Sequence, residues 1–488
     1  MLDMVKKDVK EKKDNKGITV DKDDFSEWFT QLMLKADLAD YTDVSGCIVF
    51  KPGSYELWEK IQKETDKRFK KMGIRNTYFP IFIPEKHLNK EKEHVEGFSP
   101  EVAWVTQVGN TKLSERLAIR PTSETIMYPS YSKWIRSWRD LPLKYNQWNN
   151  VVRWEFSHPV PFFRTREFLW NELHTAIATE KEAMEEGFNI LDIYKEVCEK
   201  YLALYGLSGR KTESEKFAGG VASFKLHYII PTGRVIEGPC FHYDGQRFAK
   251  AYNIKFLNKK GKEEYVWQNT YAISTRMLGT MFAIHSDDKG IIIPPKIAIN
   301  QIVIVPILFD DSKEKVLKEA NKIAKELSEF GAFVDERDNY KPGFKFNEWE
   351  LKGIPLRIEI GPKDMEKNKV VLIRRDNSEK KIVDMKHVKS ESDRILNEIQ
   401  DSLYKKSKKL FESKIDHADK IDRLKKIISE KKVALSPLCK NIECEESIKY
   451  ETGGAKAVFI SEDKVKNNDK CIICSKKADY LVYIGKTY

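Results

Sequence analysis

The chain has 488 residues, of which 41% are hydrophobic, so it is long enough for about two to four domains that each bury a core. It contains no run of about eighteen apolar residues and begins with many charged residues, which argues against a membrane span or a secretory signal and makes the cytoplasm the expected location. Lys and Arg outnumber Asp and Glu by 86 to 75, a net charge of +11 that suits a polyanionic partner but also suits many other proteins.

Residues 1–20 are densely charged and lack apolar periodicity, so we expect a mobile tail that either stays solvated or touches a nucleic acid. Residues 21–296 mix amphipathic helices with short β-rich stretches, which predicts an α+β domain. An example is the helical pattern of Tyr55–Met72, which is followed by the strand-like stretch Asn76–Ile83.

A new alternation of strands and a helix begins after Ile291–Pro295 and predicts a compact α/β domain over residues 297–402. Its expected elements are a strand at Gln301–Leu308, a helix at Lys313–Phe330, and strands at Ala332–Asp335, Leu356–Ile360 and Val370–Arg375. A long, highly charged, helix-prone stretch, His387–Lys432, leads into a last domain over residues 403–488.

The stretch Tyr145–His174 combines arginines and a carboxylate in the pattern of two strands joined by a turn. Arg153 and Glu155 precede a short proline-containing loop, and Arg164 follows it. The planar guanidinium of arginine holds phosphate or carboxylate through two hydrogen bonds at once. An isolated Arg-x-Glu is more often a surface ion pair, so the interpretation depends on the flanking sequence.

These flanks resemble motif 2 of class II aminoacyl-tRNA synthetases, in which such a strand pair grips ATP. Tyr55–Met72, Gly73 and the strand that reaches Pro80 resemble motif 1, which builds the dimer interface in that family. Asn269–Phe282, with Arg276, resembles motif 3. Each match alone is compatible with ordinary core packing, but the three in order predict a class II synthetase and a homodimer.

Within class II, the segment Arg120–Tyr128 (RPTSETIMY) resembles the prolyl-tRNA synthetases, whose members use its Thr and Glu to receive the secondary amine of proline. A carboxylate in a semi-enclosed pocket suits a cationic imino group, although a bare T-S-E is also a common helix N-cap. The segment between Arg164 and Arg276 is too short for the editing insertion of bacterial-type enzymes, so the resemblance is to the archaeal and eukaryotic-cytoplasmic type.

The resemblance implies roles for a set of residues in this catalytic domain. For the amino acid these are Thr122, Glu124, Arg153, Trp170, Glu172, Phe217 and His242. For ATP they are Arg153, Glu155, Arg164, Thr165, Cys240, Ser274 and Arg276, with Arg153 and Arg276 as the catalytic pair. A magnesium ion would neutralise the diphosphate while the amino-acid carboxylate attacks the α-phosphate in line.

One strand departs from the family pattern, since Glu237-Gly238-Pro239-Cys240-Phe241-His242 lacks the small hydroxyl residues expected before the histidine. Glu237 takes the place of a glutamine on the metal side, and its extra negative charge predicts tighter magnesium binding. Cys240 and Phe241 either repack behind the pocket or admit a substrate other than proline.

In the α/β domain, Asp338–Asp364 resembles the anticodon-binding domain of the same family. Glu350 and Arg357 are the candidates for reading anticodon bases, because side-chain donors and acceptors distinguish base edges. A surface salt bridge is the alternative interpretation for each of them.

Four of the seven cysteines lie near the C-terminus in a C-x4-C and C-x2-C arrangement, namely Cys439, Cys444, Cys471 and Cys474. Two such pairs suit tetrahedral zinc, and a site with four thiolates is closed and therefore structural. Unligated thiols are the alternative. Relatives of this type carry a similar terminal domain that usually ends, as here, in a tyrosine, Tyr488.

The expected fold class is therefore α+β: a class II antiparallel-sheet catalytic domain, an α/β anticodon-binding domain and a zinc-binding α+β domain. The expected function is activation of proline with ATP and its transfer to tRNA(Pro). A divergent paralogue that activates another cyclic or small amino acid and a non-catalytic tRNA-binding relative are the alternatives. The retained arginines argue against the last of these.

Overall fold

The computed structural model describes residues 17–88, 101–154 and 159–488. Most of the expected tail and Glu155 lie outside these ranges. The chain forms two compact units, one made of residues up to Asp40, Val49–Leu57 and His285–Leu403, and the other of Tyr41–Ile48, Trp58–Ile284 and Tyr404–Tyr488. The four segments expected from the sequence stay a prediction. Within the described ranges, no helix is long and apolar enough to cross a membrane.

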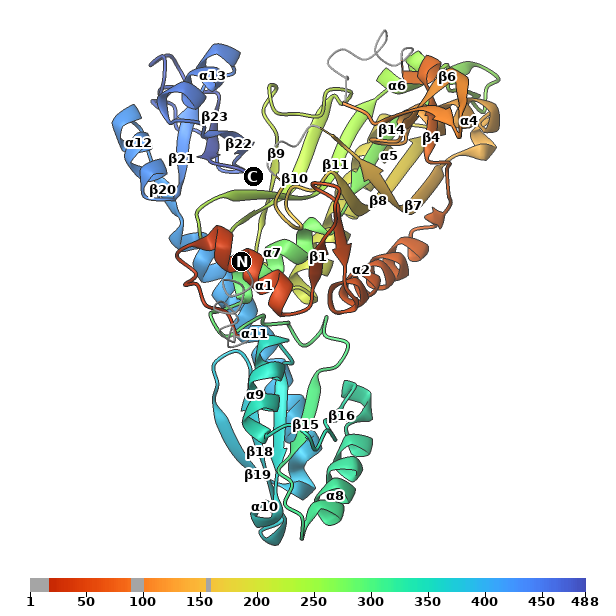
Figure 1. The fold of residues 1–488 in the computed structure, drawn as a ribbon. Helices are drawn as coiled ribbons and strands as arrows, with labels where there is room; N and C mark the ends of the chain where they lie inside the picture. The colour runs from red at the N-terminus through yellow and green to blue at the C-terminus, as the bar shows by residue number, and fades with distance from the viewer. Residues whose placement is uncertain (1–16, 89–100, 155–158) are drawn as a thin grey trace, which may run out of the picture. The chain divides into compact units, whose positions relative to one another are not determined.

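An eleven-stranded sheet forms the centre of the second unit (Figure 1). Its neighbouring strands are antiparallel, except for a parallel pair at each edge. In spatial order the strands are β20 (Ile415–His417), β21 (Val433–Leu438), β23 (Tyr480–Gly485), β22 (Lys456–Ile460), β9 (Leu207–Arg210), β10 (Ala222–Ile229), β11 (Val235–Gly245), β14 (Trp267–Ala272), β8 (Glu167–Ile177), β7 (Leu143–Val152) and β3 (Arg75–Asn76).

Helix α5 (Glu180–Lys200) packs against one face of this sheet. The hydroxyl of its N-cap, Thr179, accepts a hydrogen bond from the Glu182 amide, and an apolar stripe that includes Ile190 and Tyr194 is buried. A Cβ at Gly187 would lie 2.0 Å from the Phe241 ring, so only glycine allows this close approach of helix and strand. Because side chains alternate along a strand, Cys240 and His242 point to the opposite face, where the pocket lies.

The expected motif 1 helix is α2 (Pro52–Lys71), but the single strand expected at Asn76–Ile83 is wrong. Only β3 and β4 (Phe82–Pro84) form, and they belong to different sheets. Pro80, which lies between them, has no amide hydrogen for a ladder.

Among the described residues, three small sheets complete the strands outside the two large sheets of eleven and five strands. Strands β4, β5 (Trp104–Val108) and β6 (Thr111–Ile119) form a three-stranded sheet. Strand β1 (Ala39–Tyr41) pairs with β2 (Ile48–Phe50), and β12 (Lys255–Leu257) pairs with β13 (Glu263–Tyr265).

Three further helices of the second unit lie around the predicted site. They are α4 (Glu124–Trp134), α6 (Arg247–Tyr252) and α7 (Arg276–His285). The first residue of α7 is Arg276, one of the predicted ATP-binding residues. Helix α4 begins directly after Thr122 and Ser123, so the expected T-S-E loop lies at a helix N-terminus.

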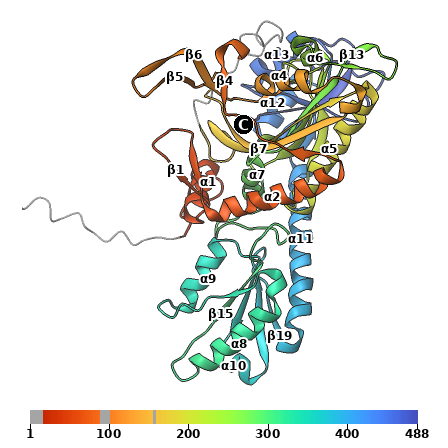
Figure 2. The ribbon, with the colours of Figure 1, turned by 90° about the vertical axis from the view of Figure 1, so that its right-hand side faces the viewer.

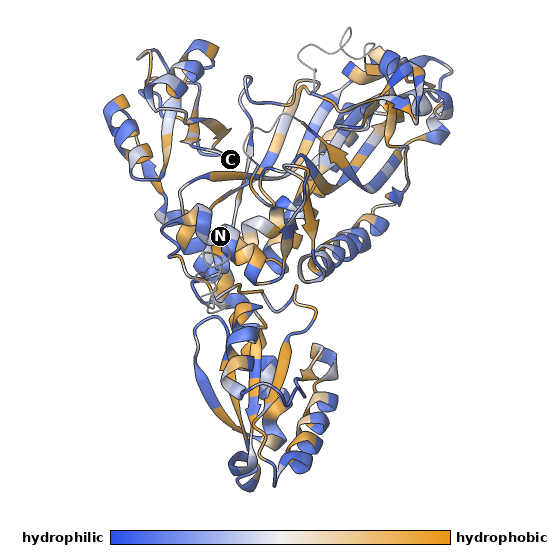
Figure 3. Ribbon diagram, viewed as in Figure 1, coloured by the Kyte–Doolittle hydropathy of each residue, from blue (hydrophilic) through white to orange (hydrophobic). Residues whose placement is uncertain are grey.

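The first unit contains α1 (Phe25–Lys35) and a five-stranded sheet in the order β16 (Phe333–Val334), β15 (Ile302–Pro306), β17 (Leu356–Ile360), β18 (Lys369–Arg374) and β19 (Lys380–Asp384). All five residues of β15 are buried, and the strand is apolar along its length (Figure 3). Helix α8 (Lys313–Glu326) runs alongside these strands (Figure 2), and α9 (Pro342–Leu351) and α10 (Pro362–Glu366) complete the α/β arrangement. The predicted α/β fold is confirmed.

The helix-prone stretch His387–Lys432 is divided. It forms α11 (Val388–Ser413), then β20, then α12 (Ile421–Ser429). Strand β20 pairs in parallel with β21, so sheet formation overrides local helix propensity there. Helix α13 (Ile442–Glu451) follows β21, and a buried cluster that includes Leu424, Ile427 and Cys444 joins α12 and α13 to these strands.

Candidate functional site

A pocket of about 430 Å³ lies on the sheet face opposite α5. Its size is within the range typical of small-molecule sites. The residues predicted for the site that line this pocket are Thr122, Glu124, Arg153, Trp170, Glu172, Phe217, Glu237, Cys240, His242, Ser274 and Arg276.

Glu172 on β8 anchors the acidic end of the pocket. Its Oε1 accepts a hydrogen bond from the Ser123 amide at 2.7 Å, and its Oε2 accepts bonds from the Ser123 hydroxyl at 2.6 Å and Gln147 Nε2 at 3.1 Å. Burial alone would raise the pKa of Glu172, but the neighbouring His174 and the hydrogen bonds from Ser123 and Thr122 outweigh burial and lower the pKa to about 2. Glu172 is therefore a fixed negative charge at neutral pH.

Glu124 behaves differently, although it is also buried. Burial is the main cause of its raised pKa, and the Glu172 carboxylate adds to the shift. The Thr122 hydroxyl lies within hydrogen-bonding distance of both carboxylates, 2.9 Å from Glu172 Oε1. Two neighbouring carboxyls whose pKa values are pushed apart take different roles, so Glu124 is the one whose charge responds to a bound cation.

His174 completes the acidic end. Its Nε2 lies 3.3 Å from Glu172 Oε1, and its Nδ1 lies 3.0 Å from the Tyr128 hydroxyl. Burial would lower its pKa, but Glu172 outweighs that effect and raises it. A histidine that lies against Glu172 thus keeps this carboxylate charged without contacting solvent.

Two predicted arginines bring positive charge to the other end. Arg153 Nε donates to the Pro121 carbonyl at 3.1 Å, and its guanidinium lies 5.5 Å from the Phe168 ring centroid and 5.4 Å from that of Trp170. Arg276 donates from Nε to the Phe163 carbonyl and from Nη1 to the Glu237 carbonyl, both at 3.2 Å. Both guanidiniums are thereby held in place.

Three further residues predicted for ATP, namely Arg164, Thr165 and Ser274, lie near Arg276. Thr165 is buried and lines a second, much smaller cavity together with Ser274 and Arg276. Arg164 lies close enough to act electrostatically on Arg276. Tyr488 stacks on Phe163, with ring centroids 4.8 Å apart, so the C-terminal segment packs against the residue whose carbonyl holds Arg276.

Aromatic and imidazole rings form one wall of the pocket. The rings of Phe217 and His242 lie 4.9 Å apart, and His242 Nδ1 lies 2.7 Å from the Ser223 hydroxyl oxygen. Burial, together with the nearby Lys225 ammonium, lowers the pKa of His242 to about 3. His242 is therefore a neutral hydrogen-bonding group.

The two unusual residues of β11 have separate environments. Cys240 lines the pocket. Phe241 is fully buried on the other face, where it stacks with Phe224 and Tyr271 at centroid distances of 5.4 Å. Phe241 is thus part of the core under α5, and of the two only Cys240 can meet a substrate.

Glu237 does not fit the magnesium site expected there. Lys211 Nζ donates to its Oε1, and Lys225 Nζ donates to its Oε2, both at 2.6 Å. A divalent cation at this carboxylate would have to displace two ammonium groups. Both carboxylate oxygens already pair with cations, which argues against this role, and the magnesium site stays a prediction.

Sequence reasoning missed several groups of the pocket. Ser123, Gln147 and His174 orient Glu172, and Lys225 lines the cationic end. The signal for His174 was its position two residues after Glu172, which places both on one face of a strand.

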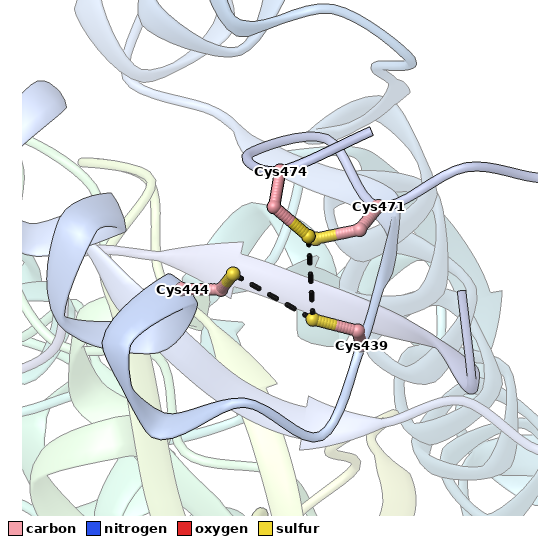
Figure 4. Close-up of side chains that lie close together, drawn as sticks. All are labelled: Cys439, Cys444, Cys471 and Cys474. Carbon is pink, nitrogen blue, oxygen red and sulfur yellow. Dashed lines mark hydrogen bonds between the residues drawn. The ribbon is translucent and has the colours of Figure 1, made fainter. Parts of the chain in front are cut away.

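The four C-terminal cysteines converge, as Figure 4 shows. Their sulfurs all lie within 4.8 Å of one another, with Cys439 Sγ 3.6 Å from Cys444 Sγ and 3.8 Å from Cys474 Sγ. Sulfurs about 2.3 Å from a tetrahedral zinc ion lie about 3.8 Å apart, so this donor set fits zinc.

Three family models match consecutive parts of the chain. The class II tRNA synthetase core domain (G, H, P, S and T) matches residues 104–285, the anticodon binding domain matches 301–393, and the prolyl-tRNA synthetase C-terminal domain matches 421–488. The cytoplasmic proline–tRNA ligase of Arabidopsis thaliana is 45% identical over 99% of this chain and 93% of its own length. The proline–tRNA ligase of Ruminiclostridium cellulolyticum is 45% identical over 98% of this chain and 100% of its own.

The chain belongs to the prolyl-tRNA synthetases. A crystal structure of prolyl-tRNA synthetase from Cryptosporidium parvum, complexed with halofuginone and AMPPNP, superimposes with a TM-score of 0.92 at 42% identity and covers 97% of both chains. The predicted family, fold class and activity are thereby confirmed: the protein is a class II aminoacyl-tRNA synthetase with proline–tRNA ligase activity. The alternative substrates are not favoured.

The two candidate anticodon residues of this prolyl-tRNA synthetase are engaged by partners within the first unit. Glu350 Oε1 accepts a hydrogen bond from Lys289 Nζ at 3.2 Å. Arg357 Nε donates to Glu359 Oε1 at 3.0 Å, and its guanidinium lies 4.5 Å from the Phe346 ring centroid. Their role in base recognition stays a prediction.

Proposed function

We propose that the pocket holds proline with its imino group at the acidic end and its carboxylate toward Arg153. The observation that carries this placement is the pairing of the permanently charged Glu172 with Glu124, whose pKa is raised by burial. A secondary ammonium beside Glu124 restores the ionised carboxylate and pairs with it. Trp170 and Phe217 supply apolar walls for the ring.

In the proposed mechanism the arginines hold ATP and the protein forms no covalent bond. Arg153, Arg164 and Arg276 bind the phosphates, and Thr165, Ser274 and Cys240 lie beside them. The proline carboxylate oxygen bonds to the α-phosphorus as the bond to the diphosphate breaks, so catalysis consists of positioning and charge stabilisation. Class II synthetases generally use ATP with Mg²⁺, whose charge would neutralise the diphosphate; the Glu237 side chain offers it no ligand.

An analogue of proline that lacks the imino nitrogen tests this placement. Tetrahydrofuran-2-carboxylate carries an ether oxygen in its place, and we expect it to compete with proline at least about 100-fold more weakly, because Glu124 is left without a cation. Competition in ATP–pyrophosphate exchange measures the difference. Equal inhibition by the analogue and by a cyclic imino acid would contradict the placement.

We further propose that Cys439, Cys444, Cys471 and Cys474 bind one structural zinc ion. Cys439 follows β21, Cys444 lies on α13, and the other two lie on the loop before β23. A metal joining these segments would hold the loop against the sheet, and a site filled by four thiolates leaves no position for substrate.

Replacing Cys444 by serine should reduce the zinc content from about one ion per chain to nearly none and lower the midpoint of thermal unfolding. Elemental analysis and thermal scans measure both effects. The matched control is Cys198→Ser, because Cys198 is also buried but lies outside the cluster. Full zinc content in the Cys444→Ser variant would count against the proposed ligand set.

Three finer assignments are proposed from the family membership. The α/β domain binds the anticodon of tRNA(Pro), with Glu350 and Arg357 as candidate contacts. Two copies form a homodimer through α2 and the segment that reaches Pro80. The protein acts in the cytoplasm.

A further inference from the structure

The cluster Lys211–Glu237–Lys225 lies at the cationic end of the pocket. Each lysine donates to a different oxygen of the Glu237 carboxylate at 2.6 Å, so two positive charges share this negative charge. Lys211 also lies 4.0 Å from Glu215, which itself pairs with Lys449 and Lys456. The cluster therefore carries a net charge of about +1 when both lysines are protonated.

The two lysines have different positions. The side chain of Lys211 is fully buried and contacts Glu237 without lining the pocket. The side chain of Lys225 is 20% exposed and lines the pocket. Lys225 is the cross-strand partner of Cys240, which lines the pocket too. Burial works against the charge of Lys225, but the Glu237 carboxylate outweighs burial and raises its pKa. Glu237 is thus a support that keeps a cation on the pocket wall.

Lys225 adds to the charge separation across the pocket. Glu124 and Glu172 lie together beside His174, whereas Lys225, Arg153 and Arg276 lie close enough for electrostatic interaction. Glu237 and Glu215 line the pocket too. A bound amino acid has its ammonium and carboxylate at opposite ends, and the α-phosphate approaches the carboxylate. A third cation beside the two arginines lowers the repulsion between these anionic groups.

We propose that Lys225 contacts the anionic oxygens of the amino-acid carboxylate and the α-phosphate and is a catalytic residue of adenylate formation. Its ammonium donates hydrogen bonds and keeps its proton. A carboxylate oxygen forms the bond to the α-phosphorus, and the bond from phosphorus to the leaving diphosphate breaks. The inference rests on the proposed placement of proline and ATP in this pocket.

The test compares ligands with and without charge at the reacting centre. The probe is 5′-O-(N-prolylsulfamoyl)adenosine, whose acyl sulfamate carries a negative charge where the adenylate has its phosphate; adenosine is the uncharged reference. Lys225→Met should weaken binding of the acyl sulfamate about 10- to 100-fold, as expected for the loss of one hydrogen bond to a charged group. Adenosine affinity should stay unchanged. Calorimetry on the purified full chain measures both.

A charge-keeping variant and a matched control complete the design. Lys225→Arg should retain most of the affinity. Lys144→Met removes another partly buried lysine, 2.7 Å from Glu186 and outside the pocket, and should bind both ligands as the unmodified protein does. Equal affinity of Lys225→Met and the unmodified protein for the acyl sulfamate, or an equal loss for both ligands, would overturn the proposal. Failure of the unmodified protein to bind the acyl sulfamate would instead refute the placement of the substrates.

Glu237→Gln tests the supporting role independently. If Glu237 positions lysines and not a metal, this variant should reach half-maximal exchange at an unchanged Mg²⁺ concentration, although its maximal rate falls. A higher Mg²⁺ requirement would make Glu237 a metal ligand and overturn its assignment as the support of Lys225.

Discussion

Replacing Glu124 by glutamine should lower kcat/KM for proline in ATP–pyrophosphate exchange by about 100-fold or more, because a buried cation then loses its carboxylate partner. The KM for ATP should change little, since the arginines at the other end of the pocket remain. The matched control is Glu186→Gln, because Glu186 is also buried but pairs with Lys144 and does not itself line the pocket. An equal loss for both substrates would indicate misfolding of the site.

The ionisation of Glu124 should also set the acidic side, or acid limb, of the pH profile of kcat/KM for proline. The Glu124 carboxyl has a raised pKa and is ionised only above it, so kcat/KM for proline should fall as the pH decreases through that pKa. Glu172, whose pKa is lowered to about 2, stays charged over this range. The Glu124→Gln variant should lack this limb. A profile that keeps its shape in the variant would assign the limb to another group.

Replacing Arg276 by alanine should lower kcat of exchange by about 100- to 1000-fold, the range typical of removing one group that stabilises developing charge. Arg276→Lys should recover only part of this loss, because a lysine keeps the charge but lacks the planar guanidinium whose separate Nε and Nη1 atoms reach the Phe163 and Glu237 carbonyls. Steady-state exchange kinetics measure both variants.

The control for Arg276 is Arg116→Lys, since Arg116 forms a half-exposed ion pair with Glu85 on the small sheet. This change should leave kcat within experimental error. If Arg276→Lys matched the unmodified protein, the two-point positioning of the guanidinium would have no catalytic value.

Local sequence was sufficient to predict the site residues that lie on strands adjacent to each other both along the chain and in the sheet. Arg153 directly follows β7, which pairs along its length with β8. Trp170 and Glu172 lie on β8, so this part of the site follows from one strand pair. The small α/β domain was equally accessible, because its apolar strand β15 and charged helix α8 have clear and different periodicities.

The cluster of Lys211, Lys225 and Glu237 could not be predicted from local sequence. Lys211, Lys225 and Glu237 come from β9–β11 and the adjoining segments, and only the pairing of these strands brings them together. A bulge between Lys225 and His227 also changes which side chains face the pocket, and no local pattern fixes its position. The lysine partners of Glu237, which argue against the predicted magnesium site, were for this reason not visible in the sequence.

Tertiary pairing also explains the other differences. The strand expected at Asn76–Ile83 divides around Pro80, and the expected C-terminal helix yields to β20 because β21 offers it a partner. The C-terminal strands continue the catalytic sheet through the contact of Ile460 with Arg210, which no composition boundary revealed.

Amino-acid-dependent ATP–pyrophosphate exchange by the protein, purified without chelators, tests the ligase activity and the proposed pocket most directly. Proline is compared with azetidine-2-carboxylate, pipecolate, alanine and cysteine. We predict the highest kcat/KM with proline and a value at least about 100-fold lower with alanine, which lacks the ring carbons that the pocket walls contact. Higher kcat/KM with another amino acid, or no exchange with any of them, would contradict the account.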